Sequence, residues 1–277
     1  MKPYRVTLFL AILIVVAAAT LLAAPPVAAK PLKCPSDQVP VGTTCVDKFE
    51  GSVWDIPAAN KGLIKQVQDG KATLAGLLAG GATQVSPGPS CTPTFPGTFP
   101  NTGNWTAPLY AASIAGVPPS ACVTWFQAEQ ACRLSGKRLL WNQEWQAAAA
   151  GTVDPGSNDG LVNAMCNTNA TGPRNTGLAG ATPGGATSCI SNWGVQDMVG
   201  NVWEWVGDWV PPASGSCGTA LFSGDENCLA GDTQAAGTGA LIRGGNSSSG
   251  PNAGVFGVNG FFAPSDASIS GGFRCAR

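Results

Sequence analysis

Residues 192–209 read NWGVQDMVGNVWEWVGDW, and this stretch decides how the chain folds. Its centre is the hexapeptide GNVWEW at 200–205, which predicts a short strand at Val202–Trp205 preceded by a tight loop. The tryptophans of Trp203–Trp209 are large apolar groups. We therefore expect them to lie in the hydrophobic core rather than to form a platform for a ligand.

Two helices are predicted upstream of this stretch. The sequence WFQAEQACRLS over Trp125–Ser135 carries apolar residues at helical spacing, with Thr124 as the N-terminal cap. A second helix is predicted at Asn142–Ala150, with Asn142 as its cap. These are the two main helices that we expect in the chain.

The remaining sequence is rich in turn-forming residues. Glycine occurs 37 times and proline 22 times, which predicts irregular loops held by large aromatic residues. Short strands are expected at Ala240–Arg243 and Gly272–Ala276. Residues 57–120 are rich in Gly, Ala, Pro and Thr, with a short helix near Gly62–Leu78. We interpret them as an insertion or a long surface excursion.

Residues 1–29 have the pattern of a signal peptide. A basic start is followed by an apolar run over Val6–Ala24 and by small residues before Lys30. The alternative is an uncleaved anchor, because a run of this length nearly spans a bilayer. We expect contact with a membrane only in that case. Residues 30–277 are predicted to form a single exported domain in the periplasm, at the cell surface or outside the cell.

The chain has no histidine, and its formal net charge is −1. Without histidine, Ser-His-Asp and Cys-His catalytic sites are excluded, as are histidine-bound zinc and the two-histidine iron site. A net charge this close to zero provides no basic surface for phosphates. We therefore expect no nucleic-acid partner.

All ten cysteines lie in the part predicted to be exported, at positions 34, 45, 91, 122, 132, 166, 189, 217, 228 and 275. An even number in an exported chain predicts five disulfides. Short spacings suggest the pairs Cys34–Cys45, Cys166–Cys189 and Cys217–Cys228. The rival interpretation, a metal–thiolate site, needs close pairs such as C-x-x-C, which the sequence lacks.

Four sequence blocks occur in order: 122–150, 192–209, Arg243-Gly244-Gly245 and Gly272-Phe273-Arg274. Together they resemble the sulfatase-modifying-factor, or formylglycine-generating-enzyme-like, family over 34–56 and 120–277. The resemblance implies an α+β domain with a C-type lectin-like fold, loop-rich, with few short strands and two main helices. It also implies the disulfide Cys132–Cys275, which leaves Cys91–Cys122 as the remaining pair.

The resemblance also bears on catalysis. The formylglycine-generating oxidases of this family bind copper through two cysteines, and those positions fall here on Ser249 and Gly254. Because Cu(I) needs soft ligands, we expect no copper and no catalysis of that type. Another branch uses histidine-bound iron, which this chain cannot provide. Two alternatives stay open: an exported oxidase acting on sulfatases with a relocated metal site, and a structural module of the envelope.

The family also carries a calcium site in the loop before the GNVWEW strand, where hard oxygen ligands suit Ca²⁺. The resemblance implies a structural calcium held by the side chains of Asp197 and Glu204 and the carbonyls of Gly200 and Val202. In the alternative, Asp197 caps a turn and Glu204 forms an ion pair. Arg243 and Arg274 are expected to pair with buried carboxylates such as Glu144 or Glu204.

The C-terminal region 241–277 resembles the variable region of target proteins that diversity-generating retroelements diversify. The fixed positions are RGG, AGVF at 253–256, APS at 263–265 and the terminal GFRCAR. Small polar residues with a few phenylalanines lie between them, as in other binding surfaces. The residues predicted to bind are Asn246, Ser247, Ser248, Ser249, Asn252, Gly257, Val258, Asn259, Gly260, Phe261, Phe262, Asp266, Ser268, Ile269 and Ser270.

Diversification of this kind changes adenines, typically in Asn codons that end in a pyrimidine, and such codons cannot become Lys, Glu, Gln, Met or Trp. None of these five residue types occurs within 246–271, although all occur elsewhere in the chain. We therefore predict an exported, non-catalytic binding protein. Its partner is expected to be an unidentified macromolecular or surface ligand that contacts residues 246–271.

Overall fold

The structure is a computed structural model in which the unit Leu32–Arg277 combines helices and separate β-sheets in an α+β arrangement. It describes residues 32–86, 105, 107–153, 166–177, 189–212, 224–229, 231 and 237–277. The predicted signal peptide lies outside these residues. Within the described ranges, no helix combines the length and the apolar character needed to cross a membrane.

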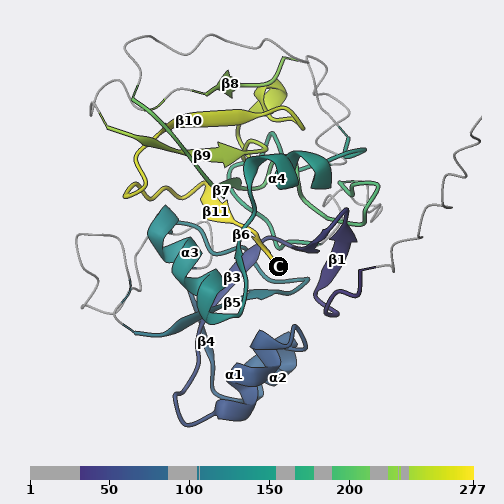
Figure 1. The fold of residues 1–277 in the computed structure, drawn as a ribbon, viewed down its shortest axis with the longest axis vertical. Helices are drawn as coiled ribbons and strands as arrows, with labels where there is room; N and C mark the ends of the chain where they lie inside the picture. Colours follow the sequence, from purple (N-terminus) through teal and green to yellow (C-terminus); the bar gives the residue numbers. More distant parts are fainter. Residues whose placement is uncertain are drawn as a thin grey trace, which may run out of the picture. The chain divides into compact units, whose positions relative to one another are not determined.

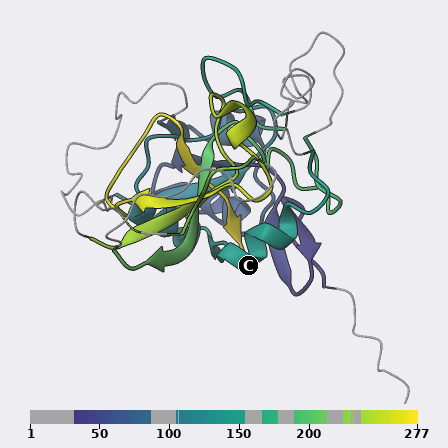
Figure 2. The ribbon, with the colours of Figure 1, turned by 90° about the horizontal axis from the view of Figure 1, so that it is seen from above.

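A four-stranded sheet joins the two ends of the unit. Strand β12 (Cys275–Ala276) lies between β2 (Thr44–Asp47) and β6 (Arg138–Leu139) and is antiparallel to both. Strand β1 (Gln38–Val41) pairs with the other edge of β2. In both views the C-terminus accordingly lies beside the purple N-terminal strands (Figures 1 and 2). The last residues of the chain are therefore part of the interior rather than a free tail.

A five-stranded sheet carries the GNVWEW strand. Its order is β11 (Gly271–Phe273), β7 (Trp203–Val210), β9 (Gly239–Arg243), β10 (Val258–Phe262) and β8 (Asn227–Cys228). The β11–β7 and β10–β8 pairs are parallel and the others antiparallel. A short 3₁₀ helix, η2 (Gly250–Asn252), lies in the connection from β9 to β10. The strands predicted around 202–205, 240–243 and 272–276 are confirmed, the last as the two strands β11 and β12.

A three-stranded antiparallel sheet and two helices form another part of the unit (Figure 1). They are β4 (Thr83–Val85), β3 (Gly51–Asp55), β5 (Leu109–Ser113), α1 (Lys61–Gln68) and α2 (Leu74–Ala79). Both β4 and β5 pair with β3, and Val85 and Leu109 are buried in a core shared with Trp203 and Trp205. The interpretation of 57–120 as a surface excursion is therefore wrong for its described part. Long-range strand pairing, which sequence composition does not reveal, builds this segment into the core.

The two main helices follow the prediction closely. Helix α3 (Trp125–Leu134) begins after Thr124, which forms a reciprocal capping box with the third residue of the helix. Helix α4 (Asn142–Ala148) lies within the predicted range. The predicted cap is wrong by one residue: Trp141 occupies the cap position, and Asn142 already has helical geometry.

The disulfides agree with the predicted pairing wherever both partners are described. The three bonds are Cys34–Cys45, Cys132–Cys275 and Cys166–Cys189. Cys122 and Cys228 are also disulfide-bonded, whereas Cys91 and Cys217, which we predicted as their partners, lie outside the described residues. Several disulfides in one chain are typical of proteins that mature in an oxidising compartment.

Candidate binding surface

The Arg-Gly-Gly motif fixes where the C-terminal segment leaves β9. Gly244 and Gly245 have φ values of +91° and +84°, in the left-handed region. A Cβ on Gly244 would lie 2.6 Å from the carbonyl oxygen of Met198, and one on Gly245 would overlap Ala253. Only glycine satisfies both the backbone angle and the close approach. The motif is therefore a structural requirement of the segment that follows it.

The first loop after the motif is held by its own turn and by a neighbouring segment. The Asn246 side-chain oxygen accepts the N–H of Ser248 at 2.8 Å and the Ser249 hydroxyl at 3.2 Å. The N–H of Gly250 donates to the carbonyl of Thr168 at 2.7 Å. Two of the predicted binding residues, Asn246 and Ser249, thus also shape the loop that displays them.

The second loop, 263–270, is tied to the start of α3 by main-chain hydrogen bonds. The carbonyl of Pro264 accepts the N–H of Trp125 at 3.0 Å, and the carbonyl of Ser268 accepts the N–H of Cys122 at 2.8 Å. Neither bond uses a side chain of the loop. Within the loop, Asp266 accepts the N–H of Ala263 at 2.9 Å and the hydroxyls of Ser268 and Ser270 lie 2.9 Å apart. The two main-chain bonds are thus the part of the support that does not depend on the loop's side chains.

The two loops line a pocket of about 90 Å³. Its apolar lining comes from Trp203, Trp205, Ile242 and Phe262, and its polar lining includes Asn246, Asp266, Ser268 and Ser270. Five of these residues were predicted to bind from the sequence. The two tryptophans and Ile242 were not, because strand residues of a hydrophobic stretch are typical of a core, and no sequence pattern shows which core side chains also border a cavity.

The predicted binding residues fall into two groups by exposure. The exposed or half-buried group, hereafter the displayed residues, is Asn246, Ser248, Ser249, Asn252, Phe261, Phe262, Asp266, Ser268, Ile269 and Ser270. The prediction of outward-facing side chains is wrong for the buried group: Ser247, Gly257, Val258, Asn259 and Gly260. The last three belong to β10, which has a strand on each side. Pairing within the sheet buries these positions.

The two positions aligned with the family's copper-binding cysteines have no thiol and differ in environment. The Ser249 hydroxyl accepts the N–H of Asn246 at 3.0 Å. A Cβ on Gly254 would overlap the carboxylate of Asp225. A cysteine side chain at position 254 would therefore require Asp225 to move.

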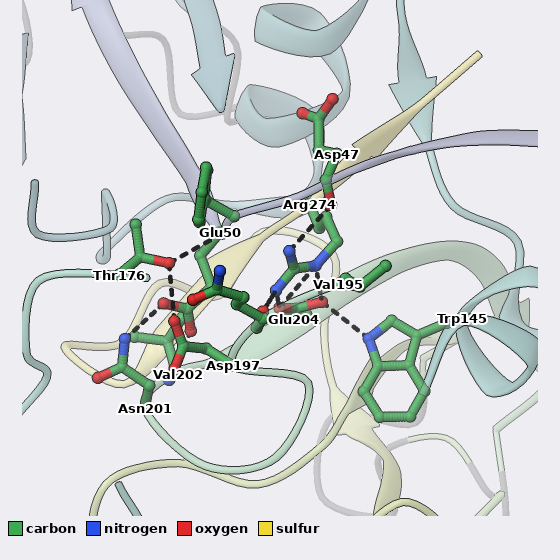
Figure 3. Close-up of polar contacts among 12 residues, drawn as sticks. Asp47, Glu50, Trp145, Thr176, Val195, Asp197, Asn201, Val202, Glu204 and Arg274 are labelled. Carbon is green, nitrogen blue, oxygen red and sulfur yellow. Dashed lines mark hydrogen bonds and ion pairs between the residues drawn. The ribbon is translucent and has the colours of Figure 1, made fainter. Parts of the chain in front are cut away.

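A buried ion pair supports the GNVWEW strand from within (Figure 3). Arg274 is fully buried, and its Nη2 lies 2.6 Å from an oxygen of Glu204. The same guanidinium donates to the carbonyls of Asp47 at 3.0 Å and Gln196 at 2.7 Å. The indole N–H of Trp145 donates to the second oxygen of Glu204 at 2.8 Å. The predicted pairing of Arg274 with a buried carboxylate is confirmed.

The predicted calcium ligands are engaged with protein donors instead. One Asp197 oxygen accepts the N–H of Gly177 at 2.7 Å and the Thr176 hydroxyl at 3.0 Å, while both Glu204 oxygens accept from Arg274. A calcium ion would therefore require both carboxylates to leave some of these donors. Among the described residues, no cluster of three or more acidic or cysteine side chains is placed to hold a metal.

A third buried carboxylate, Glu50, completes this network (Figure 3). It accepts the N–H of Val202 at 3.2 Å and a bond from the Asn201 amide. Burial, together with the negative charges of Asp197 and Glu204, raises the pKa of Glu50 well above its ordinary value. Burial also raises the pKa of Asp197. Sequence reasoning missed Glu50, because nothing in its local sequence links it to a loop 150 residues away.

Arg243 differs from the prediction. It pairs with neither Glu144 nor Glu204, since Glu144 forms its ion pair with Arg138 at 2.6 Å. Instead, Arg243 donates to the side-chain oxygen of Gln146. The two arginines that bracket the C-terminal segment are therefore stabilised in different ways.

The tryptophans of Trp203–Trp209 differ in their exposure to solvent. Trp203 and Trp205 are buried as predicted, but Trp209 is 43% exposed, so the core assignment is wrong for that residue. Its ring packs edge-on against Trp125 and Phe126, with centroids 5.1 and 5.8 Å apart. The far end of β7 thus leaves the core for the surface.

Comparisons with known proteins agree with the family resemblance of the four sequence blocks. A profile of the sulfatase-modifying factor enzyme 1-like domain matches residues 104–277. A Bos taurus protein named inactive C-alpha-formylglycine-generating enzyme 2 is 34% identical over 95 residues, which are 31% of this chain and 32% of that protein. The chain therefore spans about a third of that relative.

Two solved structures are among its structural neighbours. The Major Tropism Determinant P3c variant gives a TM-score of 0.48 at 19% identity, covering 88% of this chain and 52% of that one. Treponema denticola variable protein 1 gives a TM-score of 0.37 at 18% identity, covering 57% and 70%. At these scores the likeness carries no argument about function.

Proposed function

The chain belongs to the sulfatase-modifying factor enzyme 1-like domain family, and we propose that it is an exported, non-catalytic member that binds a macromolecular ligand through its C-terminal segment. The pocket formed by the two loops carries this proposal. Five predicted binding side chains converge there, and main-chain hydrogen bonds to Thr168, Trp125 and Cys122 tie the two loops to neighbouring segments. A surface built in this way accepts new side chains without a new fold.

The family's copper chemistry has no counterpart at the corresponding positions. Ser249 and Gly254 stand where the two cysteines are required, and Gly254 has no room for a side chain. The Bos taurus relative is itself named an inactive enzyme. Both observations favour binding over catalysis for this chain.

We propose that diversification acts on the displayed residues. These positions differ from their neighbours in exposure: the side chains of the buried group have little contact with solvent, while the displayed residues are exposed or half-buried. Large aromatic side chains dominate most protein interfaces, so Phe261 and Phe262 are the first candidates for contact residues. Asp266 adds the single charge of the segment 246–271.

Two matched libraries displayed on phage test this proposal. One library randomises the ten displayed positions, and the other randomises the five buried positions of the same segment. We expect most members of the first library, and few of the second, to resist protease in the native state. Binders to a purified cell-surface protein should then come from the first library. They should lose binding when positions 266, 268 and 270 are changed back to the native Asp, Ser and Ser. Equal protease sensitivity of the two libraries would contradict the proposal.

The enzymatic alternative has its own test. The purified protein is incubated with copper and a cysteine-containing sulfatase peptide, and formylglycine is measured by mass spectrometry. The proposal expects no conversion above the copper-only control. Copper-dependent conversion that scales with protein concentration would establish the oxidase instead.

Structural calcium at Asp197 and Glu204 stays a prediction. In the structure, a bound ion would require Glu204 to exchange Arg274 for the metal. The thermal midpoint of unfolding in EGTA and in millimolar calcium decides the matter. A higher midpoint in calcium supports a site that rearranges on binding, and identical midpoints reject it.

A further inference from the structure

Arg243 is a buried cation that has no ion-pair partner among the described residues. Only 3% of its surface is exposed. Its Nη2 donates to Gln146 and, at 3.4 Å, to the carbonyl of Val255, whereas its Nε makes no hydrogen bond. Within the described part of the chain, no carboxylate forms an ion pair with it. By contrast, Arg274 is equally buried and fully paired.

The surroundings of Arg243 stabilise its charge only in part. The guanidinium lies 4.5 Å from the centre of the Trp145 ring, at cation–π distance. Burial lowers the pKa of Arg243 to about 10, and the charge of Asp225 opposes this change. Asp225 itself accepts the N–H of Phe256 at 2.7 Å. Arg243 is therefore still protonated at neutral pH, and it carries a desolvation cost that the charge of Asp225 offsets only in part.

Arg243 lines a pocket of about 350 Å³. The other lining residues include Asn142, Gln146, Asn227, Leu229 and Phe256. The side-chain oxygen of Asn142 is buried without a partner, so a second polar group of this pocket is also unsatisfied. The apolar wall is accessible, since Leu229 is 64% exposed and Phe256 40%. This pocket shares no lining residue with the pocket of the two loops.

We propose that this second pocket binds a carboxylate attached to an apolar group, with Arg243 as the residue that contacts the anion. A guanidinium presents several N–H donors in one plane, which suits a carboxylate. An Asn side chain donates as well as accepts, so Asn142 turned the other way would bond the same anion. Leu229 and Phe256 would then contact the apolar part of the ligand.

Two kinds of ligand have a carboxylate attached to an apolar group: a free aromatic or aliphatic acid, and a peptide with an apolar C-terminal residue. Both place one carboxylate next to an apolar group. The proposal does not depend on the function proposed for the two loops, because the two pockets have separate walls. Failure at one pocket therefore leaves the other proposal intact.

Calorimetric titration of the purified chain with benzoate and with benzamide tests the charge requirement. The two probes have nearly the same shape and differ in charge. A parallel pair, the peptide Gly-Gly-Gly-Phe with a free or an amidated C-terminus, tests the peptide source. We expect at least one charged probe to bind, and we expect the affinity of its neutral partner to be at least tenfold lower. Equal binding within both pairs, or no binding of either charged probe, overturns the proposal.

A pair of variants at the edge of the pocket tests whether the probe binds in this pocket. Leu229→Asp adds a negative charge beside the pocket at an exposed position, and Leu229→Asn makes nearly the same change in shape without the charge. We expect Leu229→Asp to bind the charged probe at least fivefold more weakly than Leu229→Asn does. The two variants should have the same thermal midpoint of unfolding. Equal affinities of the two variants would show that the probe binds elsewhere.

Substitution of the arginine gives the largest effect. Arg243→Gln should abolish binding of the charged probe, whereas Arg138→Gln, which removes an arginine already paired with Glu144, should leave it unchanged. Thermal unfolding is recorded for each variant. Should Arg243→Gln fail to fold, the Leu229 pair still decides the outcome. Retained binding in a folded Arg243→Gln protein contradicts the proposal.

Discussion

The C-terminal segment contains two regions with opposite tolerance to change. The buried frame, 243–245 and 272–276, is fixed by the Arg274–Glu204 ion pair, by a strand paired on both sides and by glycines in tight contact. The displayed residues lie between these two brackets, and several, such as Ile269 at 51% exposure, extend into solvent. The comparison teaches that the frame determines the fold while the displayed residues determine what the surface contacts.

The boundary between the two regions is sharp. Adjacent glycines show it: a Cβ on Gly272 would lie 2.7 Å from a methyl carbon of Val202, whereas a Cβ on Gly271 would meet nothing closer than 3.6 Å. One residue therefore separates a position that has no space from one that has. The predictions below test whether this boundary holds, from the largest expected effect to the smallest.

Removing Arg274 should have the largest effect. Arg274→Ala leaves Glu204 buried without its cation, which costs about 3–5 kcal/mol of unfolding free energy. Arg133→Ala removes a mostly exposed side chain that pairs with Glu129 one helical turn away, and it should cost about 1 kcal/mol or less. Urea unfolding of both variants measures the difference. Similar losses for the two would mean that the frame is not the stabilising region.

The adjacent glycines provide a matched pair. Gly272→Ala forces Val202 and the carbonyl of Ser120 to move, and overpacking of this kind costs about 1–3 kcal/mol. Gly271→Ala meets only ordinary contacts and should change stability by about 0.5 kcal/mol or less. Equal unfolding midpoints for the two variants would place the boundary elsewhere.

A buried carboxylate next to the frame should make stability depend on pH: the carbonyl of Asp47 accepts from Arg274, and its side chain is fully buried. Burial, followed by the charge of Asp37, raises the pKa of Asp47 to about 6, although Lys137 at 2.6 Å opposes the rise. Between the ordinary value of 3.8 and about 6, folded Asp47 holds a proton that the unfolded chain has lost. Its contribution to stability therefore falls as pH rises through this window. Asp47→Asn should flatten the decline measured by urea unfolding at several pH values, and an unchanged slope would reject this account.

The displayed residues should show the smallest effects on stability. Asn252→Ala and Ile269→Ala change exposed side chains and should alter unfolding free energy by about 0.5 kcal/mol or less. Phe262→Ala is expected to cost more, because its ring lines the pocket and packs against the core around Trp205. Differential scanning calorimetry measures the loss of stability of the three variants. A loss for Asn252→Ala or Ile269→Ala as large as that for Gly272→Ala would break the distinction between the frame and the displayed residues.

Short sequence patterns predicted the elements that local chemistry determines. The Thr124 cap predicted α3, and the GNVWEW block predicted a short strand with its tryptophans in the core. Arg274 was expected to pair with a buried carboxylate, and Glu204 is one of the two that were named. The fixed motifs around Gly244 and Gly272 marked the ends of the segment that displays side chains. Patterns of this kind suffice where neighbouring residues supply the physical reason for the structure.

Features that depend on distant partners could not be predicted in the same way. The pairing of β4 and β5 with β3, and the burial of Val258 at the start of β10, follow from which strands become neighbours. Glu50 joins a network with residues far along the chain, and Arg243 has no carboxylate where one was expected. Each case reflects tertiary contacts that override a reasonable local interpretation.

The DNA that follows the gene tests the central claim, that the segment is a fixed frame with displayed residues free to vary. Sequencing should reveal a near-copy of the terminal coding segment beside a reverse transcriptase gene, with differences confined to adenines in codons of displayed residues. The codons of Gly244, Gly272 and Arg274 should be identical in both copies. Absence of such a copy, or differences concentrated in the codons of the buried frame, would contradict the account.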